Sequence, residues 1–127
     1  MMKFSLGMTS ALLLLSGGAA LAQTDLVSLG MGKDGLDYFI DPATIQRSRP
    51  IASFTLIAPL DPPNRLGVTR YSIFERVNCT ERTSISRTKT TYFEKIKPYT
   101  SAEDTRERSI ESGTPVAKAF EMACTSQ

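Results

Sequence analysis

The fold of this chain is decided by its C-terminal stretch, Thr114-Pro-Val-Ala-Lys-Ala-Phe-Glu-Met-Ala-Cys124, taken together with the one other cysteine, Cys79. Thr114 is a favourable N-cap, and proline suits the first helical turn, where its missing N–H has no intrahelical use. The apolar residues that follow recur at the spacing of one helix face. They predict a helix whose buried stripe consists of Val116, Ala119, Phe120, Ala123 and Cys124.

The two cysteines predict a structural disulfide, because the thiol of Cys124 lies on the buried helix stripe and the sequence has no histidine for a metal site. A Cys79–Cys124 bond pins the helix to the strand that carries Cys79, and on the chain-entropy model it is worth about 4 kcal/mol. We therefore expect the α+β class, with a single mainly antiparallel β-sheet and a C-terminal α-helix packed on one face and tethered by the disulfide.

Residues 1–22 have the pattern of a signal peptide. Lys3 precedes an apolar run, and Ala20-Leu21-Ala22 fits the small-x-small rule for cleavage. The apolar run is shorter than the ~20 residues of a membrane span. No cysteine follows the predicted cleavage site, so we expect an exported protein, periplasmic, secreted or at the cell surface, that is not a lipoprotein.

The predicted mature chain, residues 23–127, has the length of one compact domain. It carries 14 basic and 13 acidic residues, a balance that argues against a nucleic-acid-binding protein. We find no cofactor-binding motif and expect no cofactor.

The first half of the mature chain predicts a hairpin, a turn and a long strand. Residues 25–40 alternate around an Asp34-Gly35 turn signal, and Asp41 can cap a single turn over the next three residues. Residues 46–50 are expected to form a polar turn. Residues 51–60 then predict a strand, with one apolar face made by Ala52, Phe54, Leu56 and Ala58.

Two further strands are expected at residues 68–78 and 83–93. In the first, Tyr71, Ile73, Val77 and Cys79 share the side that faces the helix. In the second the faces are ambiguous, so either core contact is confined to one end or a bulge shifts the register. We expect residues 95–105 to form a polar connection and residues 106–111 a short edge strand.

Two groups of residues resemble catalytic patterns. Ser86-Arg87-Thr88-Lys89 matches the S-x-x-K pattern of penicillin-recognising enzymes, but residues three apart on a strand point to opposite faces, so we interpret the match as accidental. The acidic residues Glu103, Asp104, Glu107 and Glu111 are interleaved with arginines, which favours a solvated surface.

Basic residues outnumber acidic ones between positions 70 and 97. This strip is a candidate surface for anionic glycans, lipid phosphates or acidic proteins, although a solvated outer sheet face is the favoured interpretation. Its members are Arg70, Arg76, Arg82, Arg87, Lys89, Lys95 and Lys97.

Three ordered segments resemble the surface-adhesin protein E-like family of Gram-negative bacteria. They are the run Tyr38-Phe39-Ile40-Asp41-Pro42-Ala43-Thr44-Ile45, Ser72 followed seven residues later by Cys79, and Gly113-Thr114-Pro115 before a helix that ends in Cys124. The resemblance implies one antiparallel sheet with a disulfide-tethered helix. It also implies binding to host matrix and serum proteins, and a tendency to dimerise.

The function predicted from the sequence is therefore that of a non-enzymatic exported domain, adhesin-like, that binds envelope or host matrix proteins or anionic glycans. Two alternatives stay open. One is a structural periplasmic protein without a ligand. The other is a small hydrolase, which requires a hydroxyl nucleophile and a base other than histidine.

Overall fold

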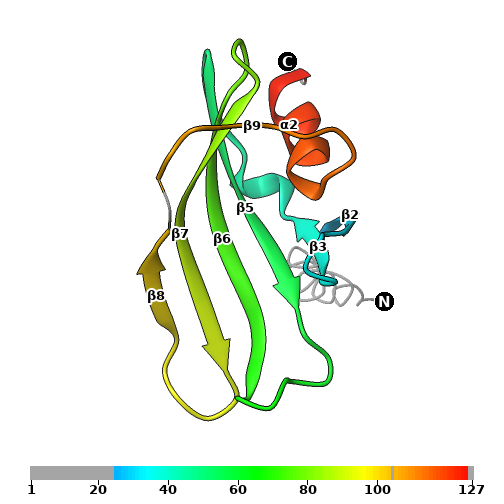
Figure 1. Ribbon diagram of the computed structural model, residues 1–127, viewed down its shortest axis with the longest axis vertical. Helices are drawn as coiled ribbons and strands as arrows, with labels where there is room; N and C mark the ends of the chain where they lie inside the picture. The colour runs from blue at the N-terminus through cyan, green and yellow to red at the C-terminus, as the bar shows by residue number, and fades with distance from the viewer. Residues whose placement is uncertain (1–24, 104, 126–127) are drawn as a thin grey trace, which may run out of the picture.

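The structure, a computed structural model, describes residues 25–103 and 105–125; the predicted signal peptide and Asp104 lie outside the described residues. The element bounds in chain order are β2 Val27–Met31, β3 Asp37–Ile40, η1 Pro42–Thr44, β4 Gln46–Ser48, β5 Ile51–Pro59, β6 Val68–Asn78, β7 Thr83–Phe93, β8 Tyr99–Ala102, β9 Arg108–Ser109 and α2 Pro115–Thr125. The strands form one antiparallel sheet in the order β2-β3-β5-β6-β7-β8, with β4 paired to β5 and β9 paired to β7 (Figure 1).

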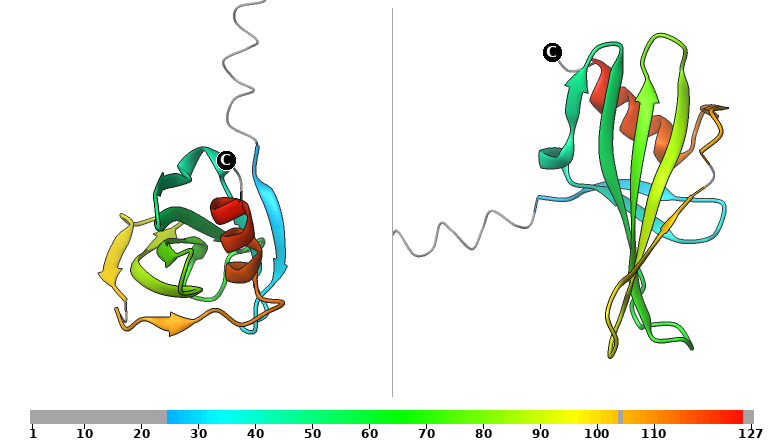
Figure 2. Two further views of the ribbon diagram at one scale, coloured as in Figure 1. Left: turned by 90° about the horizontal axis from the view of Figure 1, so that it is seen from above. Right: turned by 90° about the vertical axis from the view of Figure 1, so that its left-hand side faces the viewer.

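The helix α2 packs on one face of this sheet and contacts β2, β3, β4 and β5. Figures 1 and 2 show that it lies over one half of the sheet, while the long strands β5, β6 and β7 continue past it. The predicted α+β architecture is confirmed. Among the described residues, no helix has both the length and the apolar character needed to cross a membrane.

The core lies between α2 and the sheet and follows the predicted alternation. On β5, Ala52, Phe54, Leu56 and Ala58 are buried, and the residues between them are only partly buried. Because successive side chains of a strand point to opposite faces, these four side chains lie on the same face of the sheet. The central cluster consists of Leu29, Ile40, Ala52, Phe54, Leu56, Val77, Ala119, Phe120 and Ala123.

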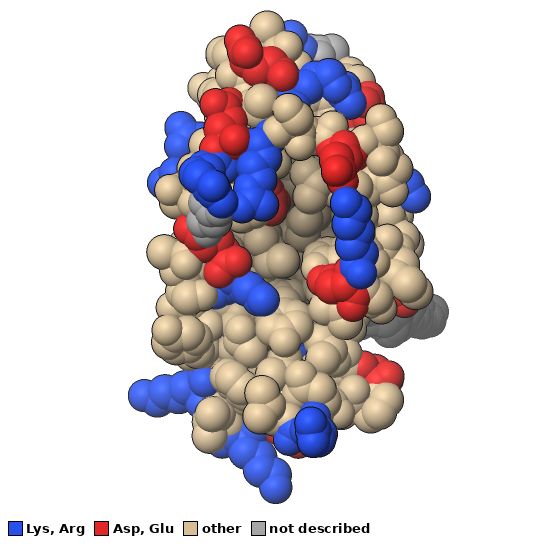
Figure 3. All heavy atoms as spheres, in the orientation of Figure 1, with Lys and Arg blue, Asp and Glu red and all other residues tan. Residues whose placement is uncertain are grey.

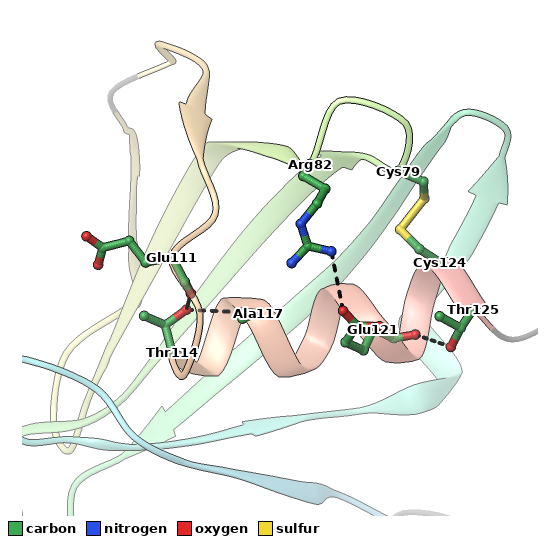
Figure 4. Close-up of polar contacts among 8 residues, drawn as sticks. All are labelled: Cys79, Arg82, Glu111, Thr114, Ala117, Glu121, Cys124 and Thr125. Atoms are coloured by element: carbon green, nitrogen blue, oxygen red, sulfur yellow. Dashed lines mark hydrogen bonds and ion pairs between the residues drawn. A yellow bond between two sulfur atoms is a disulfide. The ribbon is translucent and has the colours of Figure 1, made fainter.

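The helix begins and ends as its sequence predicts. The Thr114 hydroxyl accepts a hydrogen bond of 3.1 Å from the backbone N–H of Ala117, which makes Thr114 the N-cap (Figure 4). Ala119, Phe120 and Ala123 are buried as expected, whereas Val116 and Cys124 are half-buried at the edge of the stripe.

Two long-range contacts tether the end of the helix. The Cys79–Cys124 disulfide is present, with a Cα–Cα distance of 5.6 Å, and it joins α2 to the end of β6 (Figure 4). From β4, the Arg47 Nε donates to the carbonyl of Ala123 at 2.8 Å, and its Nη2 donates to the carbonyl of Met122 at 3.3 Å. The guanidinium thus satisfies two carbonyls of the last turn, which have no partner within a helix.

A bulge resolves the ambiguous faces of β7. Phe74 pairs with Thr88 but the next residue, Glu75, pairs with Ser86, so Arg87 is the extra residue. The register shift moves Ser86 and Lys89 onto the same side of the sheet, since their partners Glu75 and Ile73 share one parity of β6. Of the two alternatives left open for this strand, the bulge is the one observed, and the expectation that Ser86 and Lys89 point to opposite faces is wrong for this reason.

Two segments expected to be irregular contain short strands. Residues 46–48 form β4, whose side chains are all exposed, rather than part of a turn. Residues 99–102 form β8 along the outer side of β7, inside the expected polar connection. Neither strand buries an apolar face, so neither has an alternating pattern in the sequence. The expected edge strand at residues 106–111 is confirmed as the two-residue β9.

Candidate functional site

A groove opens on the helix side of the sheet, between the N-terminal end of α2 and strands β6 and β7. Its volume is about 510 Å³, and a neighbouring hollow of about 420 Å³ shares Glu75, Ser86 and Arg108 with it. Figure 3 shows a recess on this face of the molecule, with acidic and basic side chains gathered along its sides. We call this feature the helix-side groove. Its lining includes Leu56, Ile73, Pro115 and Val116 as apolar residues and Lys33, Glu75, Ser86, Lys89, Glu103, Arg108 and Glu111 as polar or charged ones.

Glu75 is the buried charged residue of the groove, with 4% of its surface exposed. It lies on the side of β6 that carries Ile73 and Val77 and therefore faces the helix layer. The Ser86 hydroxyl, directly opposite on β7, donates to its Oε2 at 2.6 Å. Burial raises the pKa of Glu75 above its ordinary value, the hydrogen bond from Ser86 lowers it in part, and the charge of Glu103 raises it further.

The hairpin β2–β3 and the segment before α2 form one side of the groove. Lys33 Nζ and Glu111 Oε1 lie 2.7 Å apart and join these two segments. The Lys33 ammonium holds the pKa of Glu111 below its ordinary value. Tyr38 donates to Asp34 Oδ2 at 2.6 Å, and burial, followed by this hydrogen bond, raises the pKa of the phenol.

The seven residues of the predicted basic strip do not form one surface. Arg70 and Arg76 lie on the face of β6 away from the helix, with the Arg70 guanidinium 3.8 Å from the centre of the Tyr92 ring. Arg82 lies in the β6–β7 turn, where it pairs with Glu121 at 3.4 Å (Figure 4). Its guanidinium also lies over the ring of Phe120.

Of the remaining four, Lys89 lines the groove, and its ammonium lies 4.3 Å from the centre of the Tyr71 ring. Arg87 is the extra residue of the bulge, and Lys95 and Lys97 lie in the connection between β7 and β8. A role of this set in binding stays a prediction.

The predicted acidic group is also dispersed. Glu103 lines the groove, Glu111 forms the ion pair at its side, and Glu107 accepts from the Thr83 hydroxyl. Asp104 lies outside the described residues. Across residues 25–103 and 105–125, no three His, Cys, Asp or Glu side chains are grouped as ligands for a metal ion.

Glu75 is a residue of the groove that the sequence did not single out. The available signal was its parity, because Glu75 alternates in phase with Ile73 and Val77 on a strand side expected to be buried. Glutamates are mostly exposed in folded proteins, so burial of Glu75 was not expected.

Taken together, the fold and the groove define a single-sheet α+β domain with a disulfide-tethered helix and a recessed, mixed-charge surface. The fold is similar to that of Haemophilus influenzae protein E in its crystal form II. That similarity has a TM-score of 0.56 and 15% sequence identity, and it covers 81% of this chain and 89% of the other. No protein-family model and no curated protein sequence matches the chain.

Proposed function

We propose that this chain is a non-enzymatic, exported domain that binds a protein partner through the helix-side groove. The observation that carries the proposal is the position of Glu75, a carboxylate that is 4% exposed and lies at the floor of a recess of about 510 Å³. Buried acids cost stability unless they are compensated, so an acid retained in such a recess favours a role in recognition.

One sequence resemblance and one fold similarity support the export and surface parts of this proposal. The ordered segments around Tyr38, Cys79 and Cys124 resemble the surface-adhesin protein E-like family, and the fold is similar to protein E. A protein partner is favoured over an anionic glycan because the basic residues are distributed over both faces of the sheet and two of its ends, rather than along one strip.

The test is capture from envelope extract by the exported protein and two variants. Val116→Arg places a long side chain in the groove, whereas Thr88→Arg places the same side chain on the open face of the sheet, where Thr88 pairs with Phe74. We expect the wild type and Thr88→Arg to capture the same partner and Val116→Arg to lose it, with all three melting cooperatively. Equal capture by both variants would contradict a groove-mediated function.

A hydrolase is the second candidate, because Ser86 and Glu75 bring a hydroxyl and a carboxylate to 2.6 Å inside the groove. This is the non-histidine base that the sequence interpretation lacked. In this hydrogen bond the Ser86 hydroxyl donates to the Glu75 carboxylate, which is the direction expected for a nucleophile and its general base. Hydrolysis of fluorogenic esters that is abolished by both Ser86→Ala and Glu75→Gln would support this second function over the first.

A further inference from the structure

Glu75 is the buried acid of the groove, and its carboxylate is in neither of the ion pairs seen between described residues. The two such pairs join Lys33 to Glu111 and Arg82 to Glu121. Glu75 instead accepts from the Ser86 hydroxyl, a neutral donor. A buried carboxylate with a neutral donor alone has much of its charge uncompensated, and it gains most from a cation supplied by a ligand.

The cations that line the groove already make interactions of their own. Lys33 is held at 2.7 Å by Glu111, and Lys89 lies over the ring of Tyr71. Arg108 also has a partner of its own. A positively charged group entering the groove would therefore meet the acid at its floor without first displacing an ion pair of that acid.

The groups around Glu75 come from every element packed at the groove. The like charge of Glu103, which follows β8, adds to that of Glu75. The full set facing the groove is Ser86 and Lys89 from β7, Lys33 and Asp34 from the β2–β3 turn, Tyr38 from β3, Glu103 after β8, Arg108 from β9 and Glu111 before α2.

Part of the groove lining around Glu75 is apolar. Leu56 and Ile73 come from the sheet, and Pro115 and Val116 come from the first turn of α2. A ligand group that fits both features has a cationic head on an apolar stem, since the stem can remove water from the walls while the head reaches the acid.

Resting on the proposed function, we infer that the helix-side groove receives a lysine or arginine side chain of the partner protein, with Glu75 as its counter-ion and Ser86 as the residue that positions the carboxylate. Charge complementarity and the apolar stem contacts select this occupant. A neutral side chain of the same length gains only the stem contacts, and an acidic one is repelled by Glu75 and Glu103.

Binding of this kind depends on pH. Glu75 must be ionised to pair with the cation. Its pKa is raised above the ordinary value because the side chain is buried and lies near the charge of Glu103. Affinity should therefore rise about tenfold per pH unit below the pKa of Glu75 and level off above it.

The experiment is an NMR titration of the isotope-labelled protein with N-acetyl lysine methylamide and with N-acetyl norleucine methylamide, which has the same stem without the ammonium group. We expect the lysine probe to shift the amide signals of Ile73, Ser86 and Val116 and the norleucine probe to bind at least about tenfold more weakly. Glu75→Gln should lose the preference for lysine. Glu81→Gln, the same change in the exposed β6–β7 turn, should keep it.

Equal shifts with both probes, an unchanged lysine preference in Glu75→Gln, or shifts confined to residues outside the groove would overturn the inference. If Glu75→Gln fails to fold, the pH series on the wild type decides, because affinity that stays constant through the titration of Glu75 contradicts the role of its charge. This result is separate from the capture experiment. Suppose that Val116→Arg loses the partner but the lysine preference does not depend on Glu75. The groove would then remain the binding site, and the inference that it receives a cationic side chain would be wrong.

Discussion

The hydroxyl of Ser86 donates a hydrogen bond of 2.6 Å to the carboxylate of Glu75 across the β6–β7 pair. This contact exists because the bulge at Arg87 brings Ser86 opposite Glu75 on the side of the sheet that faces the helix. It partly offsets the cost of burying the acid, since it lowers a pKa that burial raises. The bulge and the buried acid are therefore parts of one local arrangement.

Ser86→Ala should leave the buried carboxylate without this donor. We expect a loss of about 1.5 kcal/mol in the free energy of unfolding at neutral pH, because hydrogen bonds to charged groups are worth more than neutral ones. The pKa of Glu75 should rise further, since the contribution that lowers it is removed. Denaturant unfolding measures the first effect and carbon-13 NMR of the Glu75 carboxyl the second. An unchanged carboxyl titration would show that the hydroxyl does not contact Glu75.

Stability should depend on pH through Glu75. Its pKa is raised in the folded protein, so the native state binds its proton more tightly than the unfolded chain does. The resulting stabilisation is fully present below the ordinary value of 4.5 and is lost as the pH rises through the folded pKa. Glu75→Gln removes this titration, so the stability of the wild type relative to the variant should fall over that window.

The control for this pH series is Glu81→Gln, because Glu81 is exposed in the β6–β7 turn. Its stability should follow that of the wild type at every pH. A constant difference between wild type and Glu75→Gln across the window would mean that the pKa of Glu75 is the same in the folded and unfolded states.

The disulfide should contribute more than any single contact of the helix. The loop it closes has a sequence separation of 45 residues. On the chain-entropy model such a loop is worth about 4 kcal/mol, and α2 is too short to persist alone in water. Replacing both Cys79 and Cys124 by alanine should lower the melting temperature and accelerate amide exchange in α2 before the sheet. A variant that melts like the wild type would show that the bond does not tether the helix.

Arg47→Ala should loosen the end of α2 without affecting its start. The guanidinium donates to the carbonyls of Ala123 and Met122, and its loss leaves both without this partner. We expect the free energy of unfolding to fall by about 1 kcal/mol and amide exchange in the last turn of α2 to become faster. Arg65→Ala, in an exposed loop, is the matched control and should change neither quantity.

Thr114→Ala tests the opposite end of the helix. Its hydroxyl accepts from Ala117 N–H at 3.1 Å and donates to the carbonyl of Glu111 at 2.8 Å. Removal of this N-cap should cost about 1 kcal/mol, and Thr114→Ser, which keeps the hydroxyl, should recover most of it. If serine and alanine are equally destabilising, the methyl group rather than the cap accounts for the effect.

The sequence was sufficient for the elements that bury a regular apolar face. Helix α2 and strand β5 carry clear periods of 3.6 and 2, and Asp34-Gly35 marks the hairpin turn. It was insufficient for β4 and β8, which are held by backbone hydrogen bonds on exposed edges and leave no hydrophobic pattern. Strand β7 was still predicted without a regular apolar face, because residues 83–93 are rich in Ser, Thr and aromatic residues, which favour strands.

The site was harder to predict than the fold because it depends on one extra residue. Regular alternation along β7 would place Ser86 and Lys89 on opposite faces of the sheet, whereas the bulge at Arg87 places them on the same face. The sequence allowed a bulge in this strand but did not locate it. The parity of β6 placed Glu75 beside Ile73 and Val77, but the polarity of glutamate argued against burial.

Site-specific photo-crosslinking in cells can show whether the helix-side groove contacts the partner. A benzophenone amino acid at position 116 lies in the groove, and the same amino acid at position 88 lies on the open face of the sheet. If the partner binds in the groove, we expect a crosslinked protein product from position 116 and none from position 88. A product from position 88 alone, or equal products from both positions, would contradict it.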